Sequence, residues 1–423
     1  MKKAQWNRLD NAAKIFPPTS NLIDPKVFRC TCQLRENVDP DILQEALDET
    51  MALFPYFRSI IKKGFFWYYL EQSSLSPKAI EERKAPCGPI FAQDEHELLF
   101  ELSYYRRRIN LEVYHALTDG TGGLQFLQQL LIIYLQKCHR ELRGEDYFAD
   151  YISKQMTQDG YSKFYRKVPI QRRSNPKAYQ MKSDRFPGFR AGLIECLFPA
   201  KNLLMLAKEQ QVSVSVLLTT YLIESIHESM PFADEGRPIV ISLPVNLRSY
   251  FPTESLRNFF GVILVSHHYA TQGQSFEDVL QNVKVQFAEQ LSPEILRERI
   301  DLLMSIEKSI PARITPLILK TPGLRIGNSV YNKSFTAGMS NLGEVKMPEP
   351  FRPFVELFEV SSSTQKLDVC LCSHQGTMAV TLISSLTNTQ VQYGFVRRLT
   401  EAGIPIILDS NFPEQEGEGW DVL

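Results

Sequence analysis

Residues 108–139 constrain the fold most strongly, because they join a buried strand to a long helix through a tight turn. Apolar residues and one histidine alternate along the first part: Ile109, Leu111, Val113 and His115. A strand would carry these side chains on one face. Beyond a break at residues 121–123, apolar residues recur at helical spacing: Leu124, Leu127, Leu130, Leu131 and Tyr134. The stretch therefore predicts a strand, a turn and a helix, with His115 where the strand ends and a side chain is both held and accessible.

Strand and helix patterns alternate along the rest of the chain and predict two similar halves. We expect strands over 27–34, 98–102, 108–114, 193–198, 239–243, 262–269, 334–340, 354–360, 367–373 and 378–384. We expect helices after Asp39-Pro40 and over 200–209, 214–229, 276–291, 293–308 and 388–402. Periodicity fades in the basic, proline-containing segment between the halves. We therefore divide the chain into an N-terminal half (1–150), a crossover linker (151–189) and a C-terminal half (190–423).

An aromatic cluster near the start of the chain predicts a hairpin. Residues 54–58 and 65–69 would form its two strands, which meet across Lys63-Gly64. Packing in the core is the favoured role of these rings, and a ligand platform is the alternative.

Composition excludes several functional classes. The 423 residues are 43% hydrophobic and 22% charged, as in an ordinary globular protein, with a formal net charge of -1. Because this net charge is close to zero, it argues against binding of nucleic acid or of an anionic membrane through the overall charge of the protein. No apolar run is long enough to span a bilayer, and no apolar segment follows the first lysines to make a signal peptide. We expect a cytoplasmic protein without an integral membrane segment.

The seven cysteines point to buried thiols and not to a metal site. Cys30 and Cys32, like Cys370 and Cys372, form C-x-C pairs on predicted strands. Neither pair stands in the C-x₂₋₄-C…H-x₃₋₅-H spacing or the glycine-rich knuckles of zinc sites, although His374 follows the second pair. Buried thiols in a reducing compartment explain the pattern better, and we expect no metal.

Three short motifs carry a resemblance to a known superfamily. They are His115-Ala-Leu-Thr-Asp119-Gly120, then Pro244-Val-Asn-Leu-Arg248 followed by Asn258-Phe-Phe-Gly261, and finally Ser340-Asn341-Leu-Gly343. With the chain length, they resemble the CoA-dependent acyltransferase superfamily, which includes chloramphenicol acetyltransferases, condensation domains and bacterial alcohol or polyketide-alcohol acyltransferases. The resemblance implies an α+β fold of two chloramphenicol-acetyltransferase-like two-layer halves, a pseudodimer with a tunnel between them.

The resemblance assigns His115 as the general base of acyl transfer. An imidazole suits this role because its unperturbed pKa, ~6.5, lets it take a proton and return it near neutral pH. The sequence contains no Gly-x-Ser-x-Gly elbow, which fits a base acting directly on the acceptor. In the family the motif aspartate, here Asp119, pairs with an arginine and holds the loop, and we take Arg248 as that partner. Gly120 would leave room for a pantetheine arm, suit a turn with positive φ, or both.

Other binding roles stay open at this point. Ser340, Asn341 or a backbone N–H near Gly122 would stabilise the oxyanion, and a turn-stabilising role for Asn341 is an equal alternative. Arg248, Ser340 and Asn341 are the candidate substrate-binding residues. The basic residues of 143–189 are either solvated or in contact with CoA phosphates.

We expect an acyltransferase that moves an acyl group from acyl-CoA, or from a carrier-protein phosphopantetheine, to a small alcohol or amine. The resemblance favours the alcohol, and therefore a CoA-dependent O-acyltransferase similar to alcohol acetyltransferases. CoA is a co-substrate, and no cofactor is expected to be bound. One alternative is a stand-alone condensation-type enzyme that forms amides from carrier-bound substrates, with a separate acyl or peptidyl carrier protein as partner. Another is a non-catalytic protein that binds a carrier or other partner. A fused pseudodimer favours a monomer.

Overall fold

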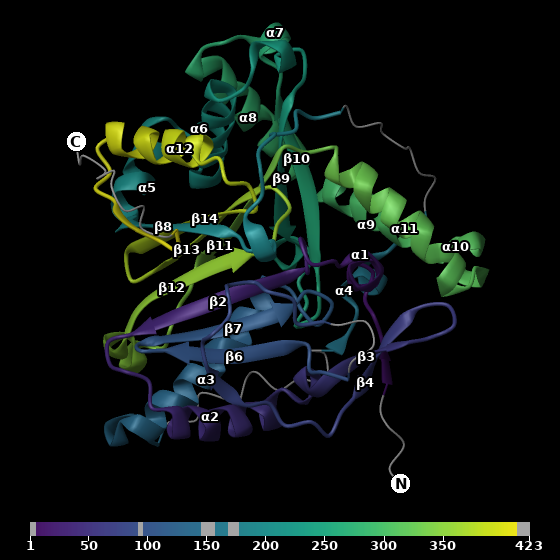
Figure 1. Ribbon diagram of the computed structural model, residues 1–423, viewed down its shortest axis with the longest axis vertical. Helices are drawn as coiled ribbons and strands as arrows, with labels where there is room; N and C mark the ends of the chain where they lie inside the picture. Colours follow the sequence, from purple (N-terminus) through teal and green to yellow (C-terminus); the bar gives the residue numbers. More distant parts are fainter. Residues whose placement is uncertain (1–5, 92–95, 145–156, 168–176, 413–423) are drawn as a thin grey trace.

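The computed structural model describes residues 6–91, 96–144, 157–167 and 177–412. Residues 151–156 and 168–176 of the predicted linker lie outside them. The described strands form a five-stranded, a seven-stranded and a three-stranded sheet. Helices cover the two larger sheets on their outer sides, and the sheets meet at the centre of the molecule (Figure 1).

The five-stranded sheet belongs mainly to the first half, in the order β12-β2-β7-β6-β5. Its strands are β2 (Val27–Leu34), β5 (Ala79–Glu81), β6 (Phe100–Tyr105), β7 (Arg108–Tyr114) and β12 (Val355–Ser362). Helices α2 (Pro40–Leu53) and α3 (Gly120–Cys138) pack together on its outer side (Figure 1). Asp39 caps α2, as predicted, by accepting hydrogen bonds from the N–H groups of Asp41 and Ile42.

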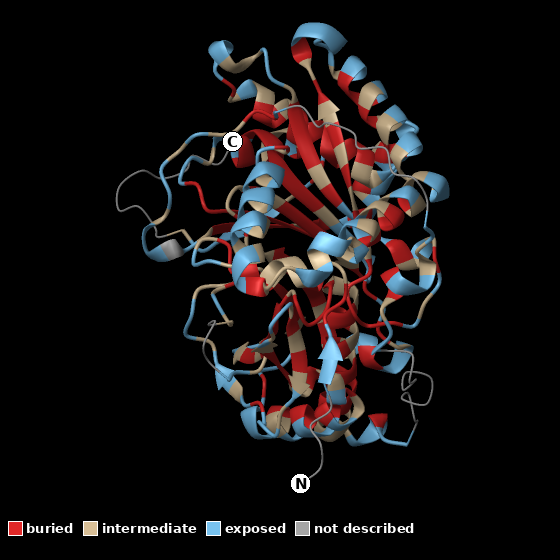
Figure 2. Ribbon diagram, turned by 90° about the vertical axis from the view of Figure 1, so that its right-hand side faces the viewer, coloured by how far each residue is buried: buried red, intermediate tan, exposed pale blue. Residues whose placement is uncertain are grey.

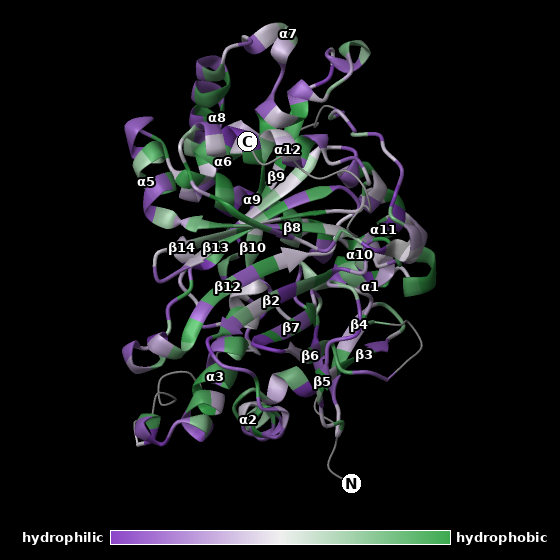
Figure 3. Cartoon of the chain, turned by 60° about the vertical axis from the view of Figure 1, so that its left-hand side comes forward, coloured by the Kyte–Doolittle hydropathy of each residue, from purple (hydrophilic) through white to green (hydrophobic). Residues whose placement is uncertain are grey.

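The seven-stranded sheet belongs to the second half, in the order β10-β9-β11-β13-β14-β8-β15. Its strands are β8 (Gly192–Pro199), β9 (Ile239–Asn246), β10 (Phe260–His267), β11 (Ala337–Glu344), β13 (Leu367–His374), β14 (Thr377–Ser384) and β15 (Ile407–Ser410). Its helices are α5 (Ala200–Glu209), α6 (Val214–Glu228), α7 (Tyr269–Gln272), α8 (Phe276–Gln290), α9 (Pro293–Lys308) and α12 (Gln390–Glu401). In Figure 3 the strands of this sheet carry apolar residues through the middle of the molecule.

Strand β12 joins the two halves. It comes from the second half of the sequence but pairs antiparallel with β2, and it also packs against β13. The two halves therefore share a strand, so the sheets do not divide the chain at one point.

Two buried clusters make up most of the core. One gathers around β2, β7, α2 and α3, and the other around α6, α8 and the strands of the seven-stranded sheet. Figure 2 shows these buried residues on the strands and on the inner faces of the helices. No helix in the described part of the chain is long and apolar enough to cross a bilayer.

The aromatic hairpin is present, but two details of its prediction are wrong. β3 (Ser59–Lys63) pairs with β4 (Tyr68–Gln72), and β1 (Trp6–Arg8) adds to β4. Pro55–Arg58 is a 3-10 helix and not a strand, because Pro55 favours the first turn of a helix. Phe65 and Phe66 lie in the connecting turn and are 72% and 42% exposed, so they are not core residues.

Several further elements were not expected from the sequence, among them α10 (Ile310–Ile314), α11 (Leu317–Asn332) and β15. A short helix α1 (Phe16–Thr19) also precedes β2. Helix α3 begins at Gly120, so residues 121–123 form its first turn and do not precede it. Pro322 inside α11 and the glycines around it hide the helical pattern.

Candidate active site

His115 lies where the two halves meet. It directly follows β7, and its backbone N–H donates to the Lys26 carbonyl at 2.8 Å, which fixes the end of the strand. Three aromatic rings surround the half-buried imidazole, with centroid distances of 5.1 Å to Phe16, 4.9 Å to Phe28 and 5.9 Å to Phe260. The first two belong to the N-terminal half and Phe260 to the C-terminal half, so both halves build this wall.

Asn258 orients the imidazole. Its amide nitrogen donates to the His115 carbonyl at 2.9 Å and to Asp10 Oδ2 at 3.2 Å. Its amide oxygen therefore faces His115 Nδ1, at 3.3 Å, and can only accept. This arrangement assigns the proton to Nδ1 and leaves the lone pair on Nε2, the tautomer that a general base needs.

A buried carboxyl holds Asn258 from behind. Asp10 is fully buried, accepts from the Ala13 N–H at 2.7 Å and lies 3.6 Å from the Arg257 guanidinium. Burial raises the pKa of Asp10 to about 6, and Arg257 opposes that rise. Asp10, Asn258 and His115 thus form a chain of contacts from the core to the imidazole.

Burial also lowers the pKa of His115 below its ordinary value of 6.5, against the opposing effects of Asp119 and Asn258. A lower pKa keeps the imidazole unprotonated at neutral pH. The ring can therefore accept a proton without first losing one.

Asp119 points away from this ring environment and into the structure. It is the N-cap of α3, and its Oδ1 accepts from the Gly122 N–H at 3.2 Å. Its Oδ2 accepts from Arg248 at 2.7 Å and from the Phe259 N–H at 2.9 Å. The side chain is only 8% exposed, so the carboxylate is enclosed with both oxygens engaged.

Arg248 ties the motif loop to the second half. It sits in the 3-10 turn after β9, and besides Asp119 its guanidinium donates to the carbonyls of Ser255 and Arg257. The ion pair expected from the sequence is thus present. Its guanidinium is committed to protein acceptors, so Arg248 has the contacts of a structural residue and not of a substrate ligand.

Gly120 packs closely against another motif. It is the first residue of α3 and does not have positive φ, so the conformational reason considered from the sequence is wrong. An added Cβ would lie 3.0 Å from the Leu342 side chain. The first and third motifs therefore touch at this point. Gly122 is tighter, because a Cβ there would lie 2.5 Å from the Leu256 carbonyl.

Ser340 and Asn341 lie on β11, and their side chains have different hydrogen-bond partners. Asn341 Oδ1 accepts from the Gly343 N–H at 2.8 Å, and its amide nitrogen donates to Ser215 at 3.1 Å. These contacts stabilise the turn. The Ser340 hydroxyl instead interacts with the buried thiol of Cys370.

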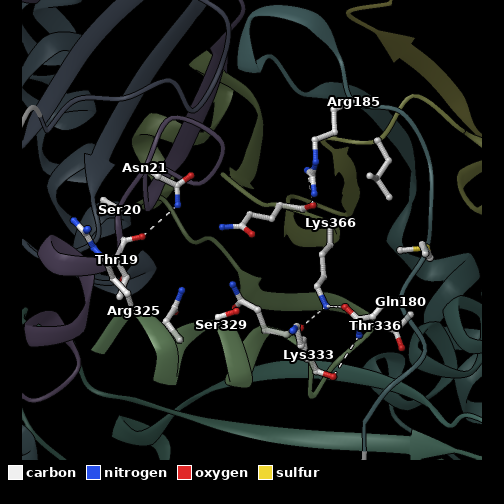
Figure 4. A pocket seen from close by; sticks show the side chains of 15 residues that line it. Thr19, Ser20, Asn21, Gln180, Arg185, Arg325, Ser329, Lys333, Thr336 and Lys366 are labelled. Atoms are coloured by element: carbon white, nitrogen blue, oxygen red, sulfur yellow. Dashed lines mark hydrogen bonds between the residues drawn. The ribbon is translucent and has the colours of Figure 1, made fainter. Parts of the chain in front are cut away.

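A cavity of about 640 Å³ opens between the halves (Figure 4). Helix α1 contacts both the cavity and the rings around His115: its Phe16 packs on His115, while its last residue, Thr19, and the following Ser20 line the cavity. His115 itself does not line it. The described lining residues include no carboxylate but several cations: Arg185, Arg325, Lys333 and Lys366.

Lys366 shows how this cavity is built. Its ammonium donates to Gln180 Oε1 at 2.8 Å and to the carbonyls of Asn332 and Phe335. Burial lowers its pKa to about 8. Arg185 donates to the Gln365 carbonyl at 2.9 Å and Arg325 to the Pro18 carbonyl at 2.9 Å.

None of the seven cysteines forms a disulfide in the structure. Six are buried, and burial raises the pKa of thiols such as Cys370, to about 12. Within the described ranges no group of three His, Cys, Asp or Glu side chains could hold a metal ion.

The residues that orient His115 become visible only in the folded structure. Asn258 stands in a stretch that the resemblance singled out, but its contact with His115 was not expected. Asp10 and Phe16 carry no local signal, because their roles depend on contacts with residues about a hundred or more positions away.

Comparisons with known proteins bear on the fold. No family model and no curated protein matches the chain. Solved structures do match. TRI101 from Fusarium sporotrichioides, solved with coenzyme A and T-2, gives a TM-score of 0.65 at 12% identity, covering 95% of this chain and 99% of that one. TRI3 trichothecene 15-O-acetyltransferase from the same fungus gives 0.62 at 11% identity, covering 94% of each chain.

The first condensation domain of the CDA synthetase gives a TM-score of 0.60 at 14% identity, covering 94% of this chain and 96% of that one. The chain therefore has the fold of acetyltransferases and condensation domains, the group that its motifs resemble. The fold predicted from the sequence is confirmed.

Proposed function

We propose that this protein transfers an acyl group from acyl-CoA to an alcohol, with His115 as the general base. The observation that carries the proposal is the orientation of His115. Asn258 fixes the Nδ1–H tautomer and leaves Nε2 free to accept, at the junction of the two halves. Similar folds solved with coenzyme A, and one neighbour named as an O-acetyltransferase, support an acyl-CoA donor and an alcohol acceptor.

One imidazole can carry out both proton transfers of the reaction. Nε2 takes the hydroxyl proton while the acceptor oxygen attacks the thioester carbon, so a C–O bond forms and the carbonyl becomes an oxyanion. The intermediate then collapses, the C–S bond breaks, and the protonated imidazole returns its proton to the leaving thiolate. The products are an ester and free CoA, with His115 restored.

We assign the oxyanion donor to Ser340. Of the three candidates from the sequence, the Gly122 N–H is engaged by Asp119 and the Asn341 amide by Ser215. The Ser340 hydroxyl interacts with the Cys370 thiol, a weak partner, and a hydroxyl can rotate to a better acceptor. One such donor is worth ~3 kcal/mol of transition-state stabilisation.

We place the phosphates of the donor in the cavity beside α1. Its cations, with no carboxylate among the described lining residues, favour an anionic ligand. Arg185 is one of the basic residues of the predicted linker. In this placement it would contact a CoA phosphate, which is one of the two roles considered for these residues from the sequence. The thioester would then reach past Phe16 to His115.

A cytoplasmic monomer is part of the same proposal. Buried cysteines that form no disulfide suit a reducing compartment. A carrier-protein donor is kept as the alternative source of the thioester, because condensation domains share the fold.

Release of free thiol from acetyl-CoA and longer acyl-CoAs, measured against a panel of alcohols and amines, tests the proposal. Thiol release that requires an alcohol, with the ester identified by mass spectrometry, is the expected result. Release only with amines would instead indicate a condensation-type enzyme. No release from any CoA donor, with or without acceptor, would contradict the proposal.

The phosphate site has its own test. Lys333→Ala should raise the KM for acetyl-CoA and leave the KM for acetyl-pantetheine unchanged, because only CoA carries the phosphates. Lys201→Ala, outside the described cavity lining, is the matched control. An equal change for both donors would place the phosphates elsewhere.

A further inference from the structure

Helices α10 and α11 form an unusual edge of the molecule. Of the sixteen residues of α11, only Leu317 is buried. Large apolar side chains at this edge are mostly exposed: Ile310 72%, Ile314 65%, Ile318 73%, Leu319 69%, Ile326 66% and Val330 66%. Single exposed apolar residues are normal, but six of them on two consecutive helices indicate an interaction surface.

Helix α11 has two different open faces. Arg325, Asn328, Ser329 and Asn332 follow helical spacing and line the cavity. Leu319, Gly323, Ile326 and Val330 are spaced i, i+4, i+7 and i+11, which places them on another face. A Cβ added at Gly323 would meet nothing within 4 Å, so the apolar face is open. The helix is therefore polar toward the cavity and apolar toward the outside.

The β3–β4 turn extends the apolar face. The Phe65 carbonyl accepts from the Leu317 N–H at 2.8 Å. The Lys320 ammonium donates to the carbonyls of Phe66 and Ala312, at 2.9 and 2.7 Å, and so ties the turn to α10. Figure 1 shows α10 at the outer edge with the β3–β4 turn beside it. We call this projecting group the apolar tip: Phe65, Phe66, Ile310, Ile314, Ile318 and Leu319.

The charged side chains of α10, α11 and the residues beside them are all basic. Between residues 308 and 333 the chain contains no Asp or Glu but several basic residues: Lys308, Arg313, Lys320, Arg325 and Lys333. Lys308 and Arg313 are exposed on either side of Ile310. Arg325 and Lys333 line the cavity, and Lys320 is held by the carbonyls of Phe66 and Ala312, so Lys308 and Arg313 are the cations that flank the apolar tip.

We propose that the apolar tip docks this protein on the surface of an anionic phospholipid membrane. Exposed aliphatic and aromatic side chains would enter the headgroup region while neighbouring Lys and Arg side chains contact lipid phosphates. The tip projects, with its largest side chains mostly exposed, which suits insertion into a fluid interface. A peripheral contact of this kind needs no membrane-spanning helix. It is independent of the proposed acyl transfer.

Co-sedimentation with extruded vesicles tests the proposal. Wild-type protein should bind phosphatidylcholine vesicles containing about 30% phosphatidylglycerol, more weakly in high salt and much more weakly without phosphatidylglycerol. Ile314→Ser combined with Ile318→Ser should weaken binding about tenfold or more, because two inserted side chains are lost. Both positions are exposed, so the fold should be retained, as circular dichroism and thermal unfolding would verify.

Two further variants sharpen the test. Gly323→Leu adds an apolar side chain to the open face of α11 and should strengthen vesicle binding. Phe232→Ser is the matched control, because Phe232 is 86% exposed but lies outside the tip, and it should bind like the wild type. Equal sedimentation of wild type and the Ile314/Ile318 variant would overturn the proposal. Self-association that the same variant abolishes, without vesicle binding, would identify a second copy of the chain as the occupant and would also overturn it.

Discussion

His115 and Asp119 stand four positions apart in one motif, yet their surroundings differ completely. His115 is half-buried among aromatic rings, with Nδ1 held by Asn258 and Nε2 left to accept a proton. Asp119 is enclosed, and both of its oxygens accept hydrogen bonds from the protein. The turn between them thus separates a reactive group from a structural one.

The comparison shows why a motif does not define equal roles for its residues. A group that reacts needs a free lone pair and a tuned pKa, whereas a group that positions a loop needs its acceptors filled. Changes on the His115 side should therefore alter rate more than stability. Changes on the Asp119 side should lower stability, and rate with it.

The largest effect is expected for His115→Ala. Loss of the general base should lower kcat for acyl transfer by about a hundredfold to ten-thousandfold. The free energy of unfolding should change much less than in Asp119→Ala, because loss of the half-buried imidazole leaves no buried charge without its partner. His96→Ala, at an exposed histidine, is the control and should retain wild-type activity.

Asp119→Ala should have the largest effect on stability. It leaves the guanidinium of Arg248, 12% exposed, without its carboxylate partner, which should cost about 3–5 kcal/mol in chemical unfolding. Activity should fall as well, because the loop that carries His115 loses its anchor. An unchanged unfolding midpoint would show that the ion pair is not structural.

Asn258→Ala tests orientation on the His115 side. Without the amide, the imidazole can adopt either tautomer, and kcat/KM should fall by about tenfold to a hundredfold. The hydrogen bond to Asn258 raises the pKa of His115, so its removal should move the acidic limb of the pH–rate profile to lower pH. A loss of rate with an unchanged acidic limb would contradict an orienting role.

Asp10→Asn should have the smallest effect of the four substitutions. We expect it to change how the free energy of unfolding depends on pH. The folded-state pKa of Asp10, about 6, lies above the ordinary value of 3.8. Between these values the folded protein binds more protons than the unfolded chain, so this group makes stability fall as pH rises through that window. In urea unfolding, the free energy of unfolding of the variant should decrease less than that of the wild type between these two pH values. An equal decrease in both proteins would show that Asp10 does not cause it.

The sequence alone predicted the strands and helices whose residues follow a regular local pattern. Periodicity and capping residues predicted β7, α5, α9 and the start of α2, because alternation and helical spacing act over a few residues. The Asp119–Arg248 pair followed from two motifs and a resemblance. Helix α11 was missed because Pro322 and its glycines weaken the pattern, and its apolar face is turned outward.

The contacts behind His115 could not be predicted from the sequence. Asp10 meets Asn258 across 248 positions, and nothing near either residue marks the other. The structural role of Gly120 likewise depends on Leu342, which only the packing of β11 against α3 brings close. These parts of the site come from tertiary packing and not from local sequence.

One paired measurement tests the central claim most directly: kcat for CoA release and the free energy of unfolding, for His115→Ala and Asp119→Ala beside the wild type. We predict that His115→Ala loses at least about a hundredfold in kcat and much less stability than Asp119→Ala, whereas Asp119→Ala loses stability first. Near-normal turnover by a folded His115→Ala protein would contradict the account.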